Sequence, residues 1–418
     1  MINIDLLIKQ KEFVDASLEN RGEDSTITDK ILEVYKLLNE SKHTYEKLRQ
    51  ERNVLSQSNS VVSDDDKIAK AREIKSSLSI LEKEKRELED KYSNLIMQLP
   101  NVLDEDTPVG KDEDENVILY SENVPDASDF KRKEHWDIEV CKRDIDFERG
   151  VKLSGSRFYV LKNKLAQLQR ALIYFLLEKH NESGYTELNL PYIVQEKCLL
   201  GAGQLPKFEE NLYHDHKEDF WLIPTSEVSI TYLHANELFA SNFSTINYCS
   251  YSPCFRREKM SAGRDVRGIK RGHQFDKVEL YKICHPDESK TEHEKMLEHI
   301  VSICKQLKIP YRIKLLCSGD IGFAAMKTYD VELWAAGSQE WLEVSSISNC
   351  GDFQGRRSKI RIKDENSKKN VYAHTLNGSA FGIPRVMIAI LENYQQADGS
   401  VAVPDCLQKY VNFKVISV

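Results

Sequence analysis

A basic loop lies between two strand-like flanks in the segment Ser252-Pro-Cys-Phe-Arg-Arg-Glu-Lys-Met-Ser-Ala-Gly-Arg-Asp-Val-Arg-Gly-Ile-Lys-Arg-Gly-His-Gln-Phe-Asp-Lys-Val-Glu279. Its central part, residues 256–271, holds seven Lys or Arg residues against two acidic ones and includes Gly263 and Gly268. The pattern predicts a β-hairpin whose two strands present guanidinium groups to one ligand. Arginine suits this role because its planar fork can meet two phosphate oxygens at once. On charge alone, a solvated basic loop is an equal alternative.

A second polar segment, residues 341–357, begins as a predicted strand. Simple alternation would put Glu343 and Ser345 on one face of this strand and Val344 and Ser346 on the other. A carboxylate and hydroxyls beside phosphate-binding arginines suit Mg²⁺, which prefers oxygen ligands and shares them with substrate phosphates. A strand with one polar face is the simpler alternative.

A third segment, residues 375–395, contains a proline where a helix is expected to begin. Pro384 suits the first helical turn, and Arg385 then lies at the N-terminal end of an amphipathic helix. Because a helix N-terminus already favours anions, the Arg385 guanidinium would strengthen an anion site there.

Residues 28–99 predict a long helical hairpin, because they contain no glycine or proline. Apolar residues recur at steps averaging about 3.5 residues, from Ile31 to Leu55 and again from Ala71 to Leu99, which is the spacing of a narrow coiled-coil seam. Residues 59–66 lie between the two series, and Ser63 can cap the second helix. We expect an antiparallel coiled-coil arm with helices of about 30 residues, roughly 45 Å long. Its 14 basic and 14 acidic residues alone would predict a solvated, salt-bridged hairpin.

An acidic segment follows the arm. Residues 104–116 have a net charge of −6 and contain Pro108 and Gly110, so we expect a linker there. Beyond it, helical stretches such as 165–177 mix with strand-like runs such as 219–223 and 340–344, without regular alternation. This favours an α+β domain with an antiparallel sheet flanked by helices over a doubly wound fold. The predicted domains are therefore residues 1–103 and 117–418, joined by the 104–116 linker.

The composition is that of a large chain outside the membrane. The 418 residues include 59 basic and 67 acidic ones, a net charge of −8. The longest apolar run, residues 171–177, is far shorter than the roughly 20 residues that span a bilayer. With no export or transit signal in view, we expect a cytoplasmic protein. Nine scattered cysteines suit reduced thiols rather than a disulfide framework.

Several familiar sites are excluded by spacing. The sequence has neither the GxxxxGK[ST] phosphate loop nor the GxGxxG dinucleotide pattern. Residues 293–299 miss the HExxH metalloprotease pattern because a leucine stands where the second histidine is required. Cys249 and Cys254 have no second cysteine pair, and His214 and His216 have no cysteine nearby. Zinc is not expected, because a structural zinc site needs four converging nitrogen or sulfur ligands.

Taken together, these segments resemble the three motifs of class II aminoacyl-tRNA synthetases, and the match narrows to the seryl-tRNA synthetases of bacterial type. Motif 1 resembles residues 165–191, a helix and a strand whose terminal Pro191 belongs to the family's dimer interface. Motif 2 resembles residues 254–279, and motif 3 resembles residues 378–394. The segments more specific for serine are Ile223-Pro-Thr-Ser-Glu227, Gly201-Ala-Gly-Gln-Leu-Pro-Lys-Phe208, Glu343-Val-Ser-Ser346, Ser348-Asn-Cys-Gly-Asp-Phe-Gln354 and Asn377-Gly-Ser379.

The resemblance implies an activity and its partners. The family activates L-serine with ATP to seryl-adenylate and transfers serine to the 3′ end of serine tRNA. It leaves open whether selenocysteine tRNA is also charged. The family works as a homodimer and uses the N-terminal arm to clasp the long variable arm of the tRNA.

The resemblance also implies site residues. Catalytic roles fall on Arg256 at the α-phosphate, Glu343 on Mg²⁺ and Arg385 at the terminal phosphates, with Ser346 as the second Mg²⁺ ligand. The serine pocket is implied to contain Thr225, Ser226, Glu227, Glu279 and Ser379. The implied ATP-binding residues are Arg256, Arg257, Glu258, Phe275 as the adenine platform, Glu343, Val344, Ser345, Ser346 and Arg385.

Two other functions remain as alternatives. A synthetase-like ligase could load an amino acid onto a carrier protein, but such homologues lack this arm. A non-catalytic coiled-coil interaction protein could be built on a synthetase body, although the retained Arg256, Glu258, Glu343 and Arg385 argue against it. The acidic total does not exclude an RNA partner, because residues 256–271 and 355–370 each carry a net charge of +5.

Overall fold

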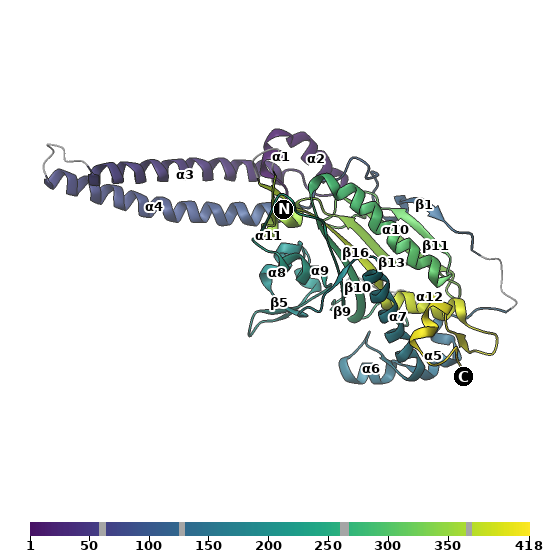
Figure 1. Ribbon diagram of the computed structural model, residues 1–418. Coiled ribbons are helices and arrows are strands. Elements are labelled where there is room, and N and C mark those ends of the chain that lie inside the picture. Colours follow the sequence, from purple (N-terminus) through teal and green to yellow (C-terminus); the bar gives the residue numbers. More distant parts are fainter. Residues whose placement is uncertain (58–63, 125–129, 260–266, 365–369) are drawn as a thin grey trace. The chain divides into compact units, whose positions relative to one another are not determined.

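The computed structural model describes residues 1–57, 64–124, 130–259, 267–364 and 370–418 (Figure 1). The chain divides into two compact units, one of residues 2–100 and one of residue 1 with residues 101–418. The predicted turn of the arm around Ser63 and the tip of the basic loop, residues 260–266, lie outside the described residues.

The first unit is helical, and its long hairpin confirms the prediction from the apolar spacing. Its helices are α1 (Ile4–Lys9), α2 (Lys11–Asn20), α3 (Ile27–Gln57) and α4 (Asp64–Ile96). The rings of Tyr35 and Tyr92 lie 5.4 Å apart, and Lys42 Nζ lies 3.2 Å from Glu89 Oε1. Because the position on α4 falls as that on α3 rises, the two helices are antiparallel (Figure 1).

The seam of this hairpin is thin. Ile31, Val34 and Leu38 on α3 and Ile74 and Leu78 on α4 are buried. These residues follow the predicted 3.5-residue spacing, and the remaining faces of both helices are mostly exposed. The hairpin therefore has one row of buried contacts rather than a core of its own.

The second unit is built on an eight-stranded sheet. Its strand order is β1-β11-β12-β13-β16-β10-β9-β4, with antiparallel pairing except between β4 and β9. The strands are β1 (Val117–Ser121), β4 (Thr186–Glu187), β9 (Ile246–Phe255), β10 (Gln274–Cys284), β11 (Tyr311–Leu315), β12 (Lys327–Ala335), β13 (Glu340–Asn349) and β16 (His374–Gly382). The predicted α+β fold with a largely antiparallel sheet is confirmed. The strand predicted for motif 1 at residues 185–191 is shorter in the structure, where only residues 186–187 (β4) form a strand.

Helices and small sheets surround this large sheet (Figure 1). The helices are α5 (Glu139–Asp144), α6 (Phe147–Ser154), α7 (Asn163–Glu182), α8 (Glu196–Ala202), α9 (Glu227–Leu233), α10 (Ser289–Leu307), α11 (Phe353–Ser358) and α12 (Ile383–Tyr394). The short strands are β2 (Ile145–Asp146) with β3 (Val160–Leu161), β5 (Ile193–Gln195) with β6 (Tyr213–Asp215) and β7 (Phe220–Leu222), β8 (Leu238–Phe239) with β14 (Arg361–Lys363) and β15 (Asn370–Tyr372), and β17 (Val401–Ala402) with β18 (Val415–Ile416).

The two faces of the large sheet differ in chemistry. Val278 and Leu280 of β10 and Leu376 and Ala380 of β16 join one buried apolar cluster with side chains from α7, α10 and α12. Strand residues alternate between faces, so the neighbours of these apolar residues point to the opposite side. That opposite face carries polar and charged side chains and holds the candidate site.

The acidic segment 104–116, expected as a linker, is part of the second unit and is hydrogen-bonded to other segments of it. Thr107 Oγ1 donates to the Met326 carbonyl at 2.7 Å, and Asn116 Nδ2 donates to Asp320 at 2.8 Å. Lys290 lies 3.0 Å from Glu105. Acidic composition alone does not reveal these partners, because they lie about 200 residues further along the chain.

Among the described residues, no helix is both long and apolar enough to cross a membrane. All nine cysteines are free thiols.

A matched pair of substitutions tests the arm seam. Leu78 is 7% exposed and Ile80, two residues further along α4, is 66% exposed. Leu78→Ala should cost the arm about 2 kcal/mol or more, because it deletes buried methyl groups, whereas Ile80→Ala should stay within about 0.5 kcal/mol. Thermal unfolding followed by circular dichroism at the helix band measures both. Equal effects of the two substitutions would contradict the seam.

Candidate active site

A cavity of about 500 Å³ lies on the polar face of the large sheet. Its walls come from β10, β13 and β16, from the start of α12, and from the loops around residues 203–212 and 322–325. Ten of the residues predicted for the site line it: Thr225, Glu227, Arg256, Glu258, Phe275, Glu343, Val344, Ser346, Ser379 and Arg385. The structure therefore brings together residues that lie up to 160 positions apart in the sequence.

The predicted hairpin forms one wall of the cavity. β9 and β10 pair in antiparallel register, with Phe275 opposite Cys254. Phe275 and Lys277, two residues apart on β10, both line the cavity. Arg256 follows β9, where its Nε donates to the Pro224 carbonyl at 3.3 Å and its guanidinium lies 5.2 Å from the centre of the Phe275 ring. Arg256 thus covers one face of the aromatic ring predicted to receive adenine.

One end of the cavity contains a lysine between a hydroxyl and a carboxylate. Lys277 Nζ donates to Thr225 Oγ1 at 2.7 Å and forms an ion pair with Glu279. Thr225 Oγ1 in turn donates to Glu279 Oε2 at 3.1 Å. The other Glu279 oxygen, Oε1, is buried and has no hydrogen-bond partner among the described residues. An unpaired buried carboxylate oxygen is costly, so a hydrogen-bond donor of a ligand that reached Glu279 Oε1 would be strongly favoured.

Glu227 adds a second carboxylate at the same end. It is the first residue of α9, directly after the N-cap Ser226, and its Oε1 accepts a hydrogen bond of 2.7 Å from Gln354 Nε2. The Gln354 carbonyl oxygen accepts from the Tyr281 hydroxyl at 2.9 Å and from Thr375 Oγ1 at 2.7 Å, so the amide is held in one orientation. Burial, and then the neighbouring Glu279 charge, raises the pKa of Glu227 to about 7.

The opposite end of the cavity is basic. Arg385 donates to the Glu343 carbonyl at 2.7 Å and lies 3.2 Å from the Glu343 carboxylate. Arg271 lies 3.5 Å from the Glu258 carboxylate. Desolvation acts to raise the pKa of Glu343, but Arg385, with Arg256 and Arg271 nearby, brings that pKa below its ordinary value. Arg385 therefore pairs directly with Glu343, and the charges of Arg256 and Arg271 also act on this carboxylate.

A β-bulge corrects the face assignment expected along residues 343–346. The register pairs Val331 with Ser345 but Glu332 with Glu343, so Val344 is an extra residue in β13. Glu343 and Ser346 consequently both line the cavity, whereas Ser345 is fully buried behind it. The prediction that Glu343 and Ser345 lie on the same face of the strand was wrong, because the bulge shifts the two-residue alternation by one position.

The bulge brings together oxygen ligands that suit Mg²⁺. Asp330 lies opposite Ser346 in the sheet, and its Oδ1 is buried without a hydrogen-bond partner among the described residues. Burial and the Glu343 charge raise the pKa of Asp330 well above its ordinary value. No group of three or more His, Cys, Asp or Glu in the described part of the chain is placed to bind a metal alone. A carboxylate and a hydroxyl fit Mg²⁺, which takes few protein ligands and completes its shell with phosphate and water oxygens.

Four predicted site residues do not line the cavity. Ser226 and Ser345 are fully buried, and Glu279 lies behind Thr225 and Lys277. Arg257, expected to contact ATP, has its guanidinium 5.5 Å from the centre of the Tyr213 ring.

Sequence reasoning missed several lining residues. Lys277 could have been found, because it lies midway between Phe275 and Glu279 at the two-residue period of a strand. Arg271 lay within the basic segment but received no role. Phe323 and Ala324 lie in a loop with no distinctive pattern and gave no signal.

Two family models match the chain. The model of the seryl-tRNA synthetase N-terminal domain matches residues 1–103. The model of the class II tRNA synthetase core domain (G, H, P, S and T) matches residues 207–394.

Full-length relatives agree with both models. A serine–tRNA ligase of Roseiflexus castenholzii is 48% identical over 98% of each chain, and one of Dehalococcoides mccartyi is 45% identical over 100% of each. Among solved structures, a seryl-tRNA synthetase from Pyrococcus horikoshii complexed with ATP is 36% identical, with a TM-score of 0.92 over 100% of this chain and 99% of that one. A cytoplasmic serine–tRNA ligase from Naegleria fowleri in complex with AMP is 28% identical, with a TM-score of 0.87 over 100% and 99%.

The raised pKa of Glu227 predicts a pH-dependent stability. An acid whose pKa rises on folding stabilises the protein fully below its unfolded pKa, and that contribution is lost as the pH rises through the folded pKa. Relative to Glu227→Gln, the wild-type chain should therefore lose about 3 kcal/mol between its ordinary carboxyl pKa and a pH of about 7. Urea unfolding of both proteins from pH 4 to 8 measures the difference. A pH-independent difference would contradict the buried carboxyl.

Proposed function

The chain belongs to the seryl-tRNA synthetase family, and from this premise we propose how its cavity performs the family reaction. The protein is a class II aminoacyl-tRNA synthetase that activates serine with ATP and charges tRNA with it. The observation that carries the proposal is the division of charge inside one cavity. Glu227 lines one end, with Glu279 behind the lining residues Thr225 and Lys277, and Arg271 and Arg385 lie at the other end. Arg256 lies between the two ends, because its charge acts on both Glu227 and Glu343.

The acidic end would hold the amino acid. Glu227 and Glu279 carry two carboxyl groups against the single cation of Lys277, so a ligand ammonium would be favoured there. The hydroxyls of Thr225 and Ser379, which line the cavity, offer hydrogen bonds to a serine side chain, and the unpaired Glu279 Oε1 lies directly behind Thr225. Ser379 is the cross-strand partner of Glu279, so the two side chains lie on the same face of the sheet.

This arrangement supports selection for serine. A site that hydrogen-bonds the substrate hydroxyl rejects alanine, because a buried group such as Glu279 Oε1 would be left unpaired. Threonine has the hydroxyl but adds a methyl group, so its exclusion depends on the space that Thr225 and Ser379 leave.

The basic end would hold ATP. Adenine would stack on Phe275, and the guanidiniums of Arg256 and Arg385 would bind the α-phosphate and the terminal phosphates. The serine carboxylate then attacks the α-phosphorus in line, the bond to the bridging oxygen breaks, and pyrophosphate leaves. Both reactants are anions, so catalysis rests on positioning them and neutralising the charge that develops between them.

Glu343 and Ser346 would hold Mg²⁺, with Asp330 opposite Ser346 on the neighbouring strand β12. When bound, the ion supplies further positive charge to the phosphate oxygens. Arg385 holds the proposed metal ligand Glu343 in position, because it binds both the carbonyl and the carboxylate of that residue.

The helical arm is proposed to bind the tRNA. α3 and α4 present long exposed faces with interleaved basic and acidic residues, and the net charge of residues 28–99 is zero. A neutral arm would recognise RNA through the shape of its backbone rather than through strong general attraction.

We further propose a homodimer formed through motif 1. Tyr174 on α7 is 57% exposed and Ile193 on β5 is 55% exposed, and a hollow lined by Ile173, Leu188 and Tyr192 lies on the same surface. Exposed apolar groups of this kind favour a protein partner, and a second copy is the partner that the family implies. The protein would act in the cytoplasm, away from membranes.

No observation favours the carrier-protein ligase or the non-catalytic alternative. The N-terminal family model covers residues 1–103, and the full-length relatives carry the name of a serine–tRNA ligase.

Substitution of Arg256 tests the activation step. Arg256→Ala should lower serine-dependent ATP–pyrophosphate exchange by about 100-fold or more, because it removes a preorganised charge from the α-phosphate. Arg149→Ala is the matched control, since Arg149 of α6 pairs with Asp146 of β2 and does not line the cavity. Near-normal exchange by a folded Arg256→Ala protein would remove Arg256 from this role.

Removal of the arm tests the division of labour between the two units. A protein in which residues 28–99 are replaced by a short Gly-Ser linker should retain serine-dependent exchange and lose tRNA charging. The deletion leaves every residue that lines the cavity in place. Equal loss of both activities would refute the proposed division.

A further inference from the structure

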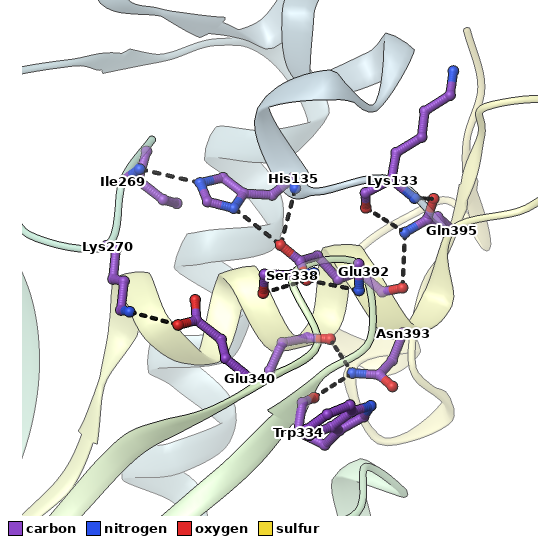
Figure 2. Close-up of polar contacts among 12 residues, drawn as sticks. Lys133, His135, Ile269, Lys270, Trp334, Ser338, Glu340, Glu392, Asn393 and Gln395 are labelled. Atoms are coloured by element: carbon purple, nitrogen blue, oxygen red, sulfur yellow. Dashed lines mark hydrogen bonds and ion pairs between the residues drawn. The ribbon is translucent and has the colours of Figure 1, made fainter. Parts of the chain in front are cut away.

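A buried histidine joins the basic loop of motif 2 to the helix of motif 3 (Figure 2). His135 lies in a short 3₁₀ turn (His135–Asp137), and its imidazole is almost fully buried. On one side, the backbone amide of Ile269 donates to His135 Nε2 at 3.2 Å. On the other side, His135 Nδ1 lies 3.2 Å from Glu392 Oε1 of α12.

These contacts determine which ring nitrogen of His135 carries the hydrogen. Because Ile269 supplies the hydrogen, Nε2 of His135 must be unprotonated and accept it. Nδ1 then carries the proton and donates to Glu392. The Glu392 carboxylate thereby sets both the tautomer and the orientation of the imidazole.

The Glu392 carboxylate is itself held from several directions. The His135 amide donates to its Oε1 at 3.0 Å, and Oε2 accepts from the amides of Gly337 and Ser338 at 2.9 and 2.8 Å and from Ser338 Oγ at 3.0 Å. Burial acts to raise the pKa of Glu392, but the hydrogen bonds from His135 and Ser338 bring it below its ordinary value. An ionised, fully bonded carboxylate is a rigid support for the ring.

The loop backbone fits closely against this support. Gly268 has φ +70°, and a Cβ there would lie 2.0 Å from His135 Nε2. Arg267, one residue earlier, places its guanidinium 4.7 Å from the centre of the Trp136 ring. Residues 267–269 therefore rest on the surface formed by His135 and Trp136, and only glycine leaves room for the ring at position 268.

The next two residues enter the cavity. Lys270 and Arg271 both line it, Lys270 pairing with Glu340 at 2.8 Å and Arg271 lying 3.5 Å from Glu258. Figure 2 shows Ile269 at the ring of His135 and Lys270 directed toward Glu340. Only one residue separates the Ile269 amide, which is hydrogen-bonded to His135, from Arg271. The backbone between them therefore has little conformational freedom.

We propose that His135, held by Glu392, is a positioning residue that fixes the backbone of residues 268–269 and thereby aims Lys270 and Arg271 at the phosphates of ATP. This inference rests on the proposed function of the cavity. It assigns a role in ATP binding to a side chain that does not itself line the cavity.

Kinetics distinguish this role from a general structural one. His135→Phe keeps a ring in the core but cannot accept the Ile269 hydrogen bond. In serine-dependent ATP–pyrophosphate exchange, its KM for ATP should rise about tenfold, the cost of one lost hydrogen bond, while its KM for serine should stay within about twofold. His135→Gln, whose amide oxygen can accept from Ile269, should recover most of the ATP affinity.

His180→Phe is the matched control. His180 is equally buried and hydrogen-bonded, to His299 at 2.8 Å, but it lies on α7 away from the basic loop. It should lower stability without a selective change in the KM for ATP. Gly268→Ala disrupts the contact between the loop and His135 from the loop side, because its Cβ would clash with the His135 ring. It should raise the KM for ATP, and it tests the proposal even if His135→Phe does not fold.

Hydrogen–deuterium exchange of the substrate-free protein gives a readout that does not depend on the reaction. The peptide covering residues 267–272 should exchange faster in His135→Phe and Gly268→Ala than in the wild type or His180→Phe. An unchanged peptide, or an equal rise in both KM values, would overturn the proposal. If the wild type showed no serine-dependent exchange, the proposed function would fail, while the peptide measurement would still decide whether His135 holds the loop.

Discussion

Alternation along β10 places Val278 and Leu280 in the apolar core and leaves Phe275 and Lys277 on the opposite face. Because the side-chain period of a strand is two, burial of one face of the sheet fixes what the other face displays. The helices α7, α10 and α12 cover the first face, so the cavity forms on the second. Its charges can then be arranged without disturbing the core.

Patterns within one segment could be predicted from the sequence. The 3.5-residue spacing predicted the α3–α4 hairpin, and the basic segment predicted the β9–β10 hairpin. Pro384 predicted the start of α12, with Arg385 in its first turn. Each depends on residues close together in the chain. The net charge of −8 was uninformative by comparison, because it averages an acidic segment with basic ones.

Features that depend on distant partners could not be predicted. The bulge at Val344 is visible only in the pairing with β12, and it decides that Ser346 rather than Ser345 joins Glu343. Gln354 supports Glu227 across 127 residues, and Glu392 supports His135 across 257. In both cases a buried partner orients a functional group, and a single sequence carries no signal of such pairs. The cavity residues were therefore easier to identify than the residues that hold them.

The central claim is that one cavity binds the amino acid at its acidic end and the phosphates at its basic end. A crystal structure with a nonhydrolysable sulfamoyl analogue of seryl-adenylate tests it most directly. The account predicts the ligand ammonium against Glu227 and Glu279, the sulfamoyl group against Arg256 and the adenine on Phe275. An ammonium group away from both carboxylates, or an analogue bound outside this cavity, would contradict it.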